Sequence, residues 1–557
     1  METENKAQKT MHPKWKKYST FFQAHSFIYR IENDKAFIKE GEFENEYDFY
    51  TNEKINDLIE NSGKDFIEKS FIYFNNSSQK IKTTKKFQFR NCIIIGKISD
   101  SEFVNLSFFQ STIDMNFELC HFNILSENKI GECLSFSNCI LWNLHFNFCK
   151  FVNEVNFSHC KDSDKLSFTN CSNTKGKLEG DNINVNKISI RSCEFERISI
   201  STQPIKPISD LKILDFDDTK IEDFSILNTD IDSLYFSVCE IDKFLCRGSI
   251  DTLVFDSSIL NDSFILTLPE HFFKNPFIIN KIKMLHCKIN LPLSFEKFKG
   301  IILDLSENSF NDELYISFDS KNLTQEKQIG SSHYDHNILV LNHSILNKIT
   351  NIDTTNIDKV FLLNTKIKDH LYITPNDFTL IKNKFDHTGF VKDDDKKKIL
   401  KNKRDQAKLL CDSYKKNDEI ENEDLAWVEF MKISGKLSKW PIKLIYSLFY
   451  SSGKFGTKPE DIVSRILIIL ILCATFYGLF DKFCLGFINT KDVMFNQEIG
   501  SIWNYLYFSV VTFLTIGYGD ISPLHWLART IAGIEGFLGV FFIAYLTISI
   551  FRKFTRN

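Results

Sequence analysis

The sequence predicts a mixed fold, in which a long cytoplasmic β-solenoid and a helical connector precede an all-α membrane unit with two spans. Three observations predict it. Apolar residues recur at a five-residue step through much of the chain before residue 375. Two apolar stretches long enough to cross a bilayer appear only after residue 460. Between these stretches lie a short apolar segment and a pair of closely spaced glycines.

Composition supports a β-rich front part and argues against several function classes. The chain has 557 residues, too many for one ordinary globular core, and its 55 Phe and only 10 Pro suit strands. With 68 basic and 72 acidic residues the net charge is −4, so we expect no nucleic-acid partner. The 14 cysteines form no CxxC pair, and neither a Ser/His/Asp set nor an HExxH motif stands out. We therefore expect no enzymatic activity and no resident cofactor.

Residues 1–86 mix helical and strand patterns, and we expect them to cap the open end of the solenoid. The first 19 residues are polar and basic, without the apolar stretch of a secretory signal. We therefore expect the front part of the chain to stay in the cytosol, where thiols remain reduced.

Residues 87–375 carry a degenerate repeat with an apolar residue at position i and a smaller or apolar residue at i−2. The longest unbroken run of position i is Phe216, Ile221, Ile226, Ile231, Phe236, Ile241 and Cys246. No helical period gives this spacing. A five-residue step suits a β-solenoid in which four short sides form each coil and successive coils pair through backbone hydrogen bonds.

This pattern resembles the pentapeptide-repeat family, which implies a right-handed β-helix with about twenty residues per coil. The sequence departs from the family at i−2, where Cys, Ser or Thr often stands in place of Ala. We interpret these cysteines as small buried hydrophobic residues. A leucine-rich repeat is the alternative, since Leu303 to Phe310 would fit one, but no such framework persists across the copies.

Residues 392–436 are expected to form a helical hairpin that connects the solenoid to the membrane unit. Residues 437–460 follow as an interfacial linker, because Trp440 to Tyr450 is apolar but too short to span a bilayer.

Residues 461–557 contain both predicted spans, an outer helix over 462–480 and an inner helix over 526–551. Basic residues gather before the first span and after the second, which predicts a multi-pass membrane protein with both termini in the cytoplasm. They are Lys436, Lys439, Lys443, Lys454 and Lys458 before the first span, Arg465 near its start, and Arg552, Lys553 and Arg556 after the second.

The segment between the spans predicts a re-entrant half-helix over 502–514 followed by a carbonyl-lined strand over 515–520. Its sequence is Thr515, Ile516, Gly517, Tyr518, Gly519 and Asp520. Glycines at i and i+2 permit backbone conformations that turn successive carbonyls towards one axis. Rings of such oxygens replace the water shell of a potassium ion.

This segment resembles the selectivity filter of the two-transmembrane potassium-channel pore family, and it matches the Thr-Val/Ile-Gly-Tyr-Gly-Asp motif at every position. The resemblance covers roughly residues 461–557. It implies a homotetramer around one pore, with K⁺ bound at Thr515, Ile516, Gly517 and Tyr518. Tyr518 favours potassium over mixed cations, and Asp520 would lie at the outer mouth.

In the inner helix, the family's usual hinge position falls on Gly539, with Gly536 one turn earlier. The alternative reading of these glycines is close helix packing. Glu535 is a costly intramembrane carboxyl that should face protein or water. The sequence does not name its partner, and Arg529 lies on a different face of the helix.

Together these features lead us to expect a potassium-selective channel subunit that conducts K⁺ passively in the plasma membrane. The expected partners are membrane lipid, three further copies of the chain and an unidentified cytoplasmic protein or ligand that acts through the repeat domain. A second interpretation is a membrane-anchored scaffold in which the pore-like end only tethers the solenoid.

Overall fold

The computed structural model describes residues 28–555 with gaps. The gaps are 33, 41–42, 52–53, 56, 59–64, 75–79, 84–85, 124–131, 161–162, 174–176, 202–210, 230, 249, 267–278, 299–300, 319–336, 386–395, 484–487 and 490–501. The chain forms two compact units, one comprising residues up to Val360 with Thr365–Asp369, the other Phe361–Asn364 with the residues from His370 onward. They are described separately.

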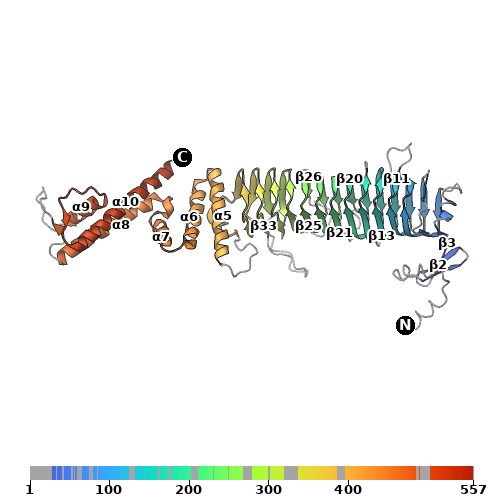
Figure 1. Ribbon diagram of the computed structural model, residues 1–557, viewed down its shortest axis with the longest axis horizontal. Helices are drawn as coiled ribbons and strands as arrows, with labels where there is room; N and C mark the ends of the chain where they lie inside the picture. Colours follow the sequence, from blue (N-terminus) through green and yellow to red (C-terminus); the bar gives the residue numbers. More distant parts are fainter. Residues whose placement is uncertain are drawn as a thin grey trace, which may run out of the picture. The chain divides into compact units, whose positions relative to one another are not determined.

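The first unit is a right-handed β-solenoid of about 11 turns, as the sequence predicts, and Figure 1 shows its strands stacked in chain order. One sheet of the solenoid has 16 strands. They are β1 (Ile28–Glu32), β2 (Lys35–Glu40), β3 (Phe43–Thr51), β5 (Ser70–Phe74), β7 (Ile93–Ser99), β10 (Thr112–Glu118), β13 (Ile140–Asn147), β16 (Ser163–Thr169), β19 (Val185–Arg191), β21 (Leu211–Asp217), β23 (Ile231–Ser237), β25 (Ile250–Asp256), β27 (Ile279–Leu285), β30 (Ile302–Asp304), β33 (Ile338–Val340) and β36 (Lys359–Phe361).

A second sheet has 18 strands, and further strands form a third sheet at the later coils. The second comprises β4 (Phe66–Glu68), β6 (Phe87–Arg90), β8 (Glu102–Val104), β9 (Leu106–Phe109), β11 (His121–Asn123), β12 (Glu132–Ser137), β14 (Lys150–Phe151), β15 (Glu154–Ser158), β17 (Ser172–Asn173), β18 (Lys177–Asp181), β20 (Glu194–Ser201), β22 (Lys220–Leu227), β24 (Glu240–Arg247), β26 (Ile259–Leu266), β28 (Lys288–Ile289), β31 (Ser309–Phe310), β34 (Ile345–Leu346) and β37 (Lys366–Ile367). The third includes β29 (Leu293–Phe298), β32 (Leu314–Phe318) and β35 (Thr350–Asp353).

The five-residue step of the sequence is the inward-facing period of the coils. The seven position-i residues of the run, from Phe216 to Cys246 in steps of five, are all buried, and so are the i−2 residues that lie between them. The expected four short sides are joined in pairs, because the alternation of buried and exposed residues breaks once within each strand, as between Ile221 and Phe224. In this stretch each coil has two strands of seven or eight residues, joined at corners where Asp218, Asn228 and Val238 take positive φ angles.

Stacked phenylalanines explain why the chain uses so many of them. Phe236 lies between Phe216 and Phe255 in neighbouring coils, with ring centroids 4.8 Å apart on both sides. Phe224 and Phe244 meet its edge from the opposite sheet. Each such pair adds about 0.5–1.5 kcal/mol beyond the burial of apolar area, so the ladder stabilises the stacking of coils.

The Leu303 segment belongs to the same stack, which rules out the leucine-rich-repeat alternative there. Leu303 pairs in parallel register with Ile282 in the coil before it and with Leu339 in the coil after it. These positions continue a ladder of inward-facing residues that includes Leu234 and Leu253.

The solenoid begins earlier than the expected residue 87. β4 and β5 already pair in parallel with β6 and β7 of the following coil. The end of the stack is capped by β1, β2 and β3, which form an antiparallel meander before β3 joins β5. Residues 1–27 of the expected cap lie outside the described residues.

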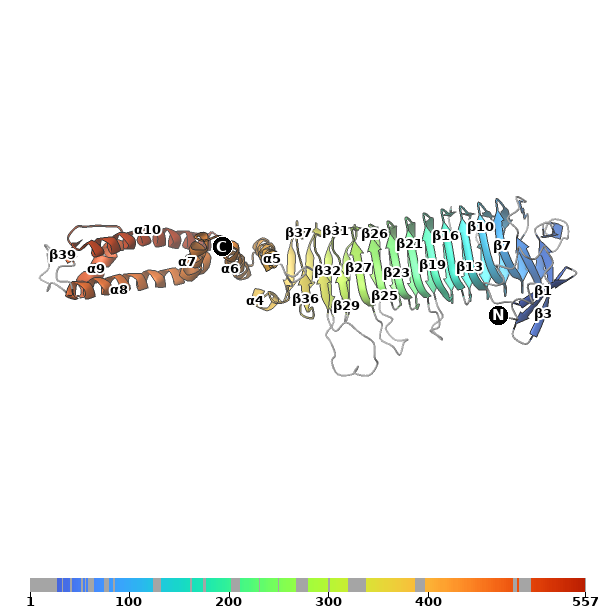
Figure 2. The ribbon, with the colours of Figure 1, turned by 60° about the horizontal axis from the view of Figure 1, so that its bottom comes forward.

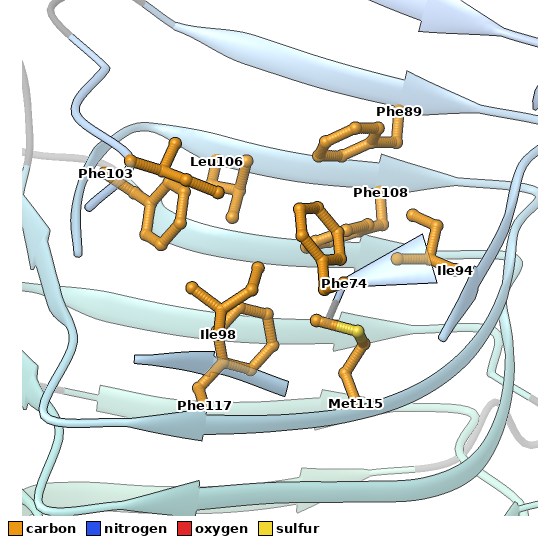
Figure 3. Close-up of a pocket in the computed structure, with 10 residues that line it drawn as sticks. Phe74, Phe89, Ile94, Ile98, Phe103, Leu106, Phe108, Met115 and Phe117 are labelled. Carbon is orange, nitrogen blue, oxygen red and sulfur yellow. The ribbon is translucent and has the colours of Figure 1, made fainter. Parts of the chain in front are cut away.

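The cysteines of the solenoid behave as small interior residues. Their thiols donate weak hydrogen bonds to backbone carbonyls, as Cys239 does to Ser237 O at 3.3 Å. Among the described residues, no group of His, Cys, Asp and Glu is placed to hold a metal ion. The interior also holds a cavity near the first coils, but its ten lining residues are all apolar, including Phe74, Phe89 and Met115 (Figure 3). Such a space offers no polar group for a ligand.

The second unit is helical after strand β38 (Leu371–Thr374). It comprises α4 (Phe378–Ile381), α5 (Lys396–Lys416), α6 (Ile420–Leu437), α7 (Ile442–Gly453), η2 (Lys454–Gly456), α8 (Pro459–Phe483), β39 (Ile488–Asn489), α9 (Ile502–Phe513), β40 (Ser522–Pro523) and α10 (Trp526–Phe554). Helices α5 and α6 occupy the segment expected to be a hairpin, of which residues 392–395 lie outside the described part. In Figure 2, α9 lies between α8 and α10.

Candidate ion-conducting site

Helices α8 and α10 are the two candidate membrane spans of the described residues. They run from Pro459 to Phe483 and from Trp526 to Phe554, and the most apolar 18-residue windows within them have mean hydropathies of 2.3 and 2.0. Both are a few residues longer than the sequence predicts. Large apolar side chains such as Leu472 and Phe537 stay exposed on them, which is the surface that lipid or further protein covers in a membrane. The chain is therefore a membrane protein.

Helix α9 is the short helix predicted between the spans, and it is packed against both. Tyr505 and Phe508 share an apolar cluster with Tyr477 of α8 and Ala528 of α10. The Tyr505 hydroxyl also donates a 2.7 Å hydrogen bond to Asp481 Oδ2 at the end of α8. At 12 residues, α9 is too short to cross a bilayer and is held as a half-helix between the two spans.

The backbone leaves helical geometry directly after α9. Thr515, Gly517 and Gly519 have φ angles of 54°, 62° and 80°, whereas Ile516 and Tyr518 are absent from the positive-φ residues of the described chain. When such conformations alternate along a strand, successive carbonyls turn towards the same side. A Cβ added to Gly517 or Gly519 would meet nothing within 4 Å, so the glycines are needed here for their backbone angles rather than for space.

The strand lies on the surface of the single chain. Ile516 is 47% exposed and Tyr518 is 70% exposed. The preceding helix places its C-terminal, negative dipole end at the start of this strand, where a cation is favoured. Backbone oxygens, a hydroxyl from Thr515 and a helix C-terminus are groups that bind an alkali cation in place of water.

The three inner-helix glycines have different surroundings. A Cβ on Gly533 would meet nothing within 4 Å, and one on Gly536 would lie 3.6 Å from Thr512 O. One on Gly539 would lie only 2.7 Å from the carbonyl carbon of Phe513, a distance that real Cβ atoms essentially never show. Gly539 thus permits close contact between α10 and the end of α9, whatever its role as a hinge.

The structure supplies the partners of Glu535 that the sequence does not name. Glu535 is 1% exposed. Its Oε2 accepts a 2.7 Å hydrogen bond from the Tyr477 hydroxyl of α8, and its Oε1 is hydrogen-bonded to the Ser509 hydroxyl of α9. Arg529 instead donates to Pro523 O at 3.2 Å, in agreement with the view that it is a poor partner.

Towards the C-terminal end of the inner helix, three side chains of α10 contact α6, α7 and η2. The Tyr545 hydroxyl donates to Phe449 O of α7 at 3.2 Å, and the Ser549 hydroxyl donates to Gly456 O at 2.8 Å. Arg552 donates to Asp424 of α6 at 2.8 Å and lies over the Trp427 ring, 5.2 Å from its centroid. The sequence does not predict these contacts, because the hydrogen-bonded residues are 93 to 128 positions apart.

The outer helix, the half-helix and the inner helix, with the carbonyl-bearing segment after α9, have the arrangement that the sequence predicts for a pore. Residues 465–556 match the family model described as "Ion channel". The curated protein "Inward rectifier potassium channel Kirbac3.1" from Paramagnetospirillum magnetotacticum is 36% identical over 74 residues. That segment is 13% of this chain and 25% of the relative, so the chain spans about a quarter of the relative it matches. No solved structure matches the chain significantly.

Proposed function

We propose that four copies of this chain form a potassium-selective channel that conducts K⁺ passively, with K⁺ bound at Thr515, Ile516, Gly517 and Tyr518. The observation that carries the proposal is the positive φ angle at alternate residues from Thr515 to Gly519, directly after a half-helix held between two spans. One chain supplies one wall of carbonyls, and a dehydrated potassium ion needs a ring of them. The permeant ion is the only ligand required.

The exposed side of the strand supports the homotetramer, because Tyr518 would otherwise stand in water beside the pore. The membrane orientation follows from charge. Arg552 and Lys553 lie near the end of α10, and Lys439 and Lys443 flank the start of α7, which favours an orientation with both termini in the cytoplasm. Trp440, just before α7, and Leu444 within α7 are both exposed, as expected of a helix that lies in the lipid interface.

We further propose that the repeat domain, or a protein or ligand bound to it, regulates the pore through the connector. Hydrogen bonds from Ser413 Oγ and Asn417 Nδ2 to Leu371 O join α5 to β38 at 2.9 and 2.7 Å. The Asp424–Arg552 contact joins α6 to the inner helix. Because α5 and α6 pack together, force on β38 has a continuous route to the cytoplasmic end of α10.

Liposome flux tests the proposal. The purified full chain, reconstituted in liposomes loaded with K⁺, is expected to release K⁺ down its gradient and to migrate as a tetramer after cross-linking. Gly517→Asp is expected to abolish the flux, because its side chain and lost backbone freedom disrupt the carbonyl rings. Gly533→Ala is the matched control and should conduct. Absence of K⁺ flux from a well-folded wild-type protein would favour the scaffold interpretation instead.

A further inference from the structure

Glu535 stands out because the proposed ion path does not use it. It lies in the middle of the inner helix, is almost fully buried, and faces Tyr477 and Cys473 of α8 and Ser509 of α9. Within the described residues no Lys, Arg or His is in ion-pair contact with it. An ionised carboxylate without a cation is costly at such a place, so the presence of an acidic side chain there needs an explanation.

The hydrogen bonds around Glu535 have a consistent assignment when the acid is neutral. The Ser509 hydroxyl carries one proton, and that proton has an acceptor in Leu470 O at 3.1 Å. The same hydroxyl oxygen is bonded to Glu535 Oε1, which then acts as the donor. Tyr477 donates to Oε2. In this arrangement the protons of the acid and of the Ser509 and Tyr477 hydroxyls each have one acceptor, and no buried charge remains.

We propose that Glu535 is a protonated carboxylic acid that positions the filter, by fixing the half-helix α9 to both membrane spans. It is a positioning residue, since it acts on the ion path through α9 and does not touch the permeant ion. The inference rests on the proposed function, to which it adds a specificity determinant outside the filter strand.

The helix register explains how the acid reaches the filter. Glu535 and Gly539 are four residues apart on α10, and their contacts on α9, Ser509 and Phe513, are also four apart. The two helices therefore meet at two successive turns. Phe513 lies two residues before Thr515, so a tilt of α9 released at Ser509 displaces the first carbonyl ring.

Infrared spectroscopy of the reconstituted full chain tests the protonation state without any measurement of conduction. A carbonyl-stretch band of a protonated carboxyl group is expected at neutral pH. It should be lost in Glu535→Gln and retained in Glu460→Gln, a matched control at an exposed glutamate at the start of α8. If the wild-type band is absent or survives in Glu535→Gln, the neutral-acid assignment is wrong.

Selectivity tests the positioning role. Glu535→Ala is expected to lower the K⁺/Na⁺ permeability ratio about tenfold, the factor that one lost buried hydrogen bond represents. Glu535→Gln should stay within about twofold of the wild type, because a neutral amide also donates to Ser509 and accepts from Tyr477. Ser509→Ala should resemble Glu535→Ala, while Ser464→Ala, at an exposed serine of α8, should not.

The outcomes separate this inference from the proposed function. A wild-type protein that does not select K⁺ contradicts the proposed function. The infrared result would in that case still decide the protonation state of Glu535. A selective wild type with an unchanged ratio in Glu535→Ala overturns the positioning role. A glutamine variant as impaired as the alanine variant also overturns it, provided that both remain tetrameric by size-exclusion chromatography.

Discussion

Gly539→Ala is the substitution whose consequence the structure defines most closely. The new Cβ would overlap the Phe513 carbonyl oxygen and lie 2.7 Å from its carbonyl carbon, whereas two carbon atoms pack best at about 3.5–4.0 Å. The inner helix and the half-helix would therefore have to move apart by at least roughly 1 Å. Such overpacking costs about 1–3 kcal/mol and outweighs the gain of about 1 kcal/mol that alanine brings to a helix.

We expect this variant to lower the thermal stability of the assembled pore and to reduce K⁺ flux. The assay is the loss of the tetramer peak in size-exclusion chromatography after heating, with liposome flux measured on the same preparation. Gly533→Ala and Gly536→Ala are graded controls, since their Cβ atoms would meet nothing within 4 Å and Thr512 O at 3.6 Å, respectively. If Gly539→Ala altered gating while its stability matched that of Gly533→Ala, Gly539 would act as a hinge and the packing argument would be refuted.

Three further expectations concern the connector and the solenoid. Arg552→Gln and Asp424→Asn should each change the ratio of open to closed channels in single-channel recordings by up to about fivefold, and the double variant no further, because both remove one partly buried ion pair. Phe236→Ala should lower the free energy of unfolding by about 3–5 kcal/mol in urea titrations, because it opens a gap in the aromatic ladder. Burial raises the pKa of the Cys246 thiol to about 12 and that of Cys287 to about 11. Since only the thiolate reacts, iodoacetamide should leave both unlabelled at pH 8 until the chain is unfolded.

Each of these has a matched control. Lys553→Gln removes an exposed charge next to Arg552 and should not alter the open ratio. Phe148→Ala truncates an exposed corner phenylalanine and should leave the urea midpoint nearly unchanged. A shift with Lys553→Gln equal to that with Arg552→Gln would mean that net charge, rather than the Asp424 contact, is responsible. Rapid labelling of Cys246 in the folded protein would contradict its interior position.

The solenoid could be predicted because its signal is local and repeated. The residues from Phe216 to Cys246 recur at a constant step, and each one is buried. The positions of the corners were harder to predict, because each corner depends on a single residue with a positive φ angle. Val238 takes such an angle although it is an apolar residue that no turn rule selects. The early start at Phe66 was missed because β4 and β5 are short and lack the complete pattern.

In the helical unit, the proposed filter could be predicted because its chemistry is confined to six consecutive residues between two spans. The partners of Glu535 could not be predicted, since Tyr477 and Ser509 are 58 and 26 residues away on separate helices. Helical periodicity gives the face of a helix but not the neighbour that it meets. The Arg552–Asp424 contact was hidden for the same reason, with 128 residues between its members.

The reversal potential under bi-ionic conditions tests the central claim most directly. The purified full chain in a planar bilayer, with K⁺ on one side and Na⁺ on the other, is expected to carry current that reverses far from zero, towards the potential at which K⁺ is at equilibrium. A reversal potential near zero in a conducting tetramer would show that sodium passes as readily as potassium, and the carbonyl rings from Thr515 to Tyr518 would not select between them.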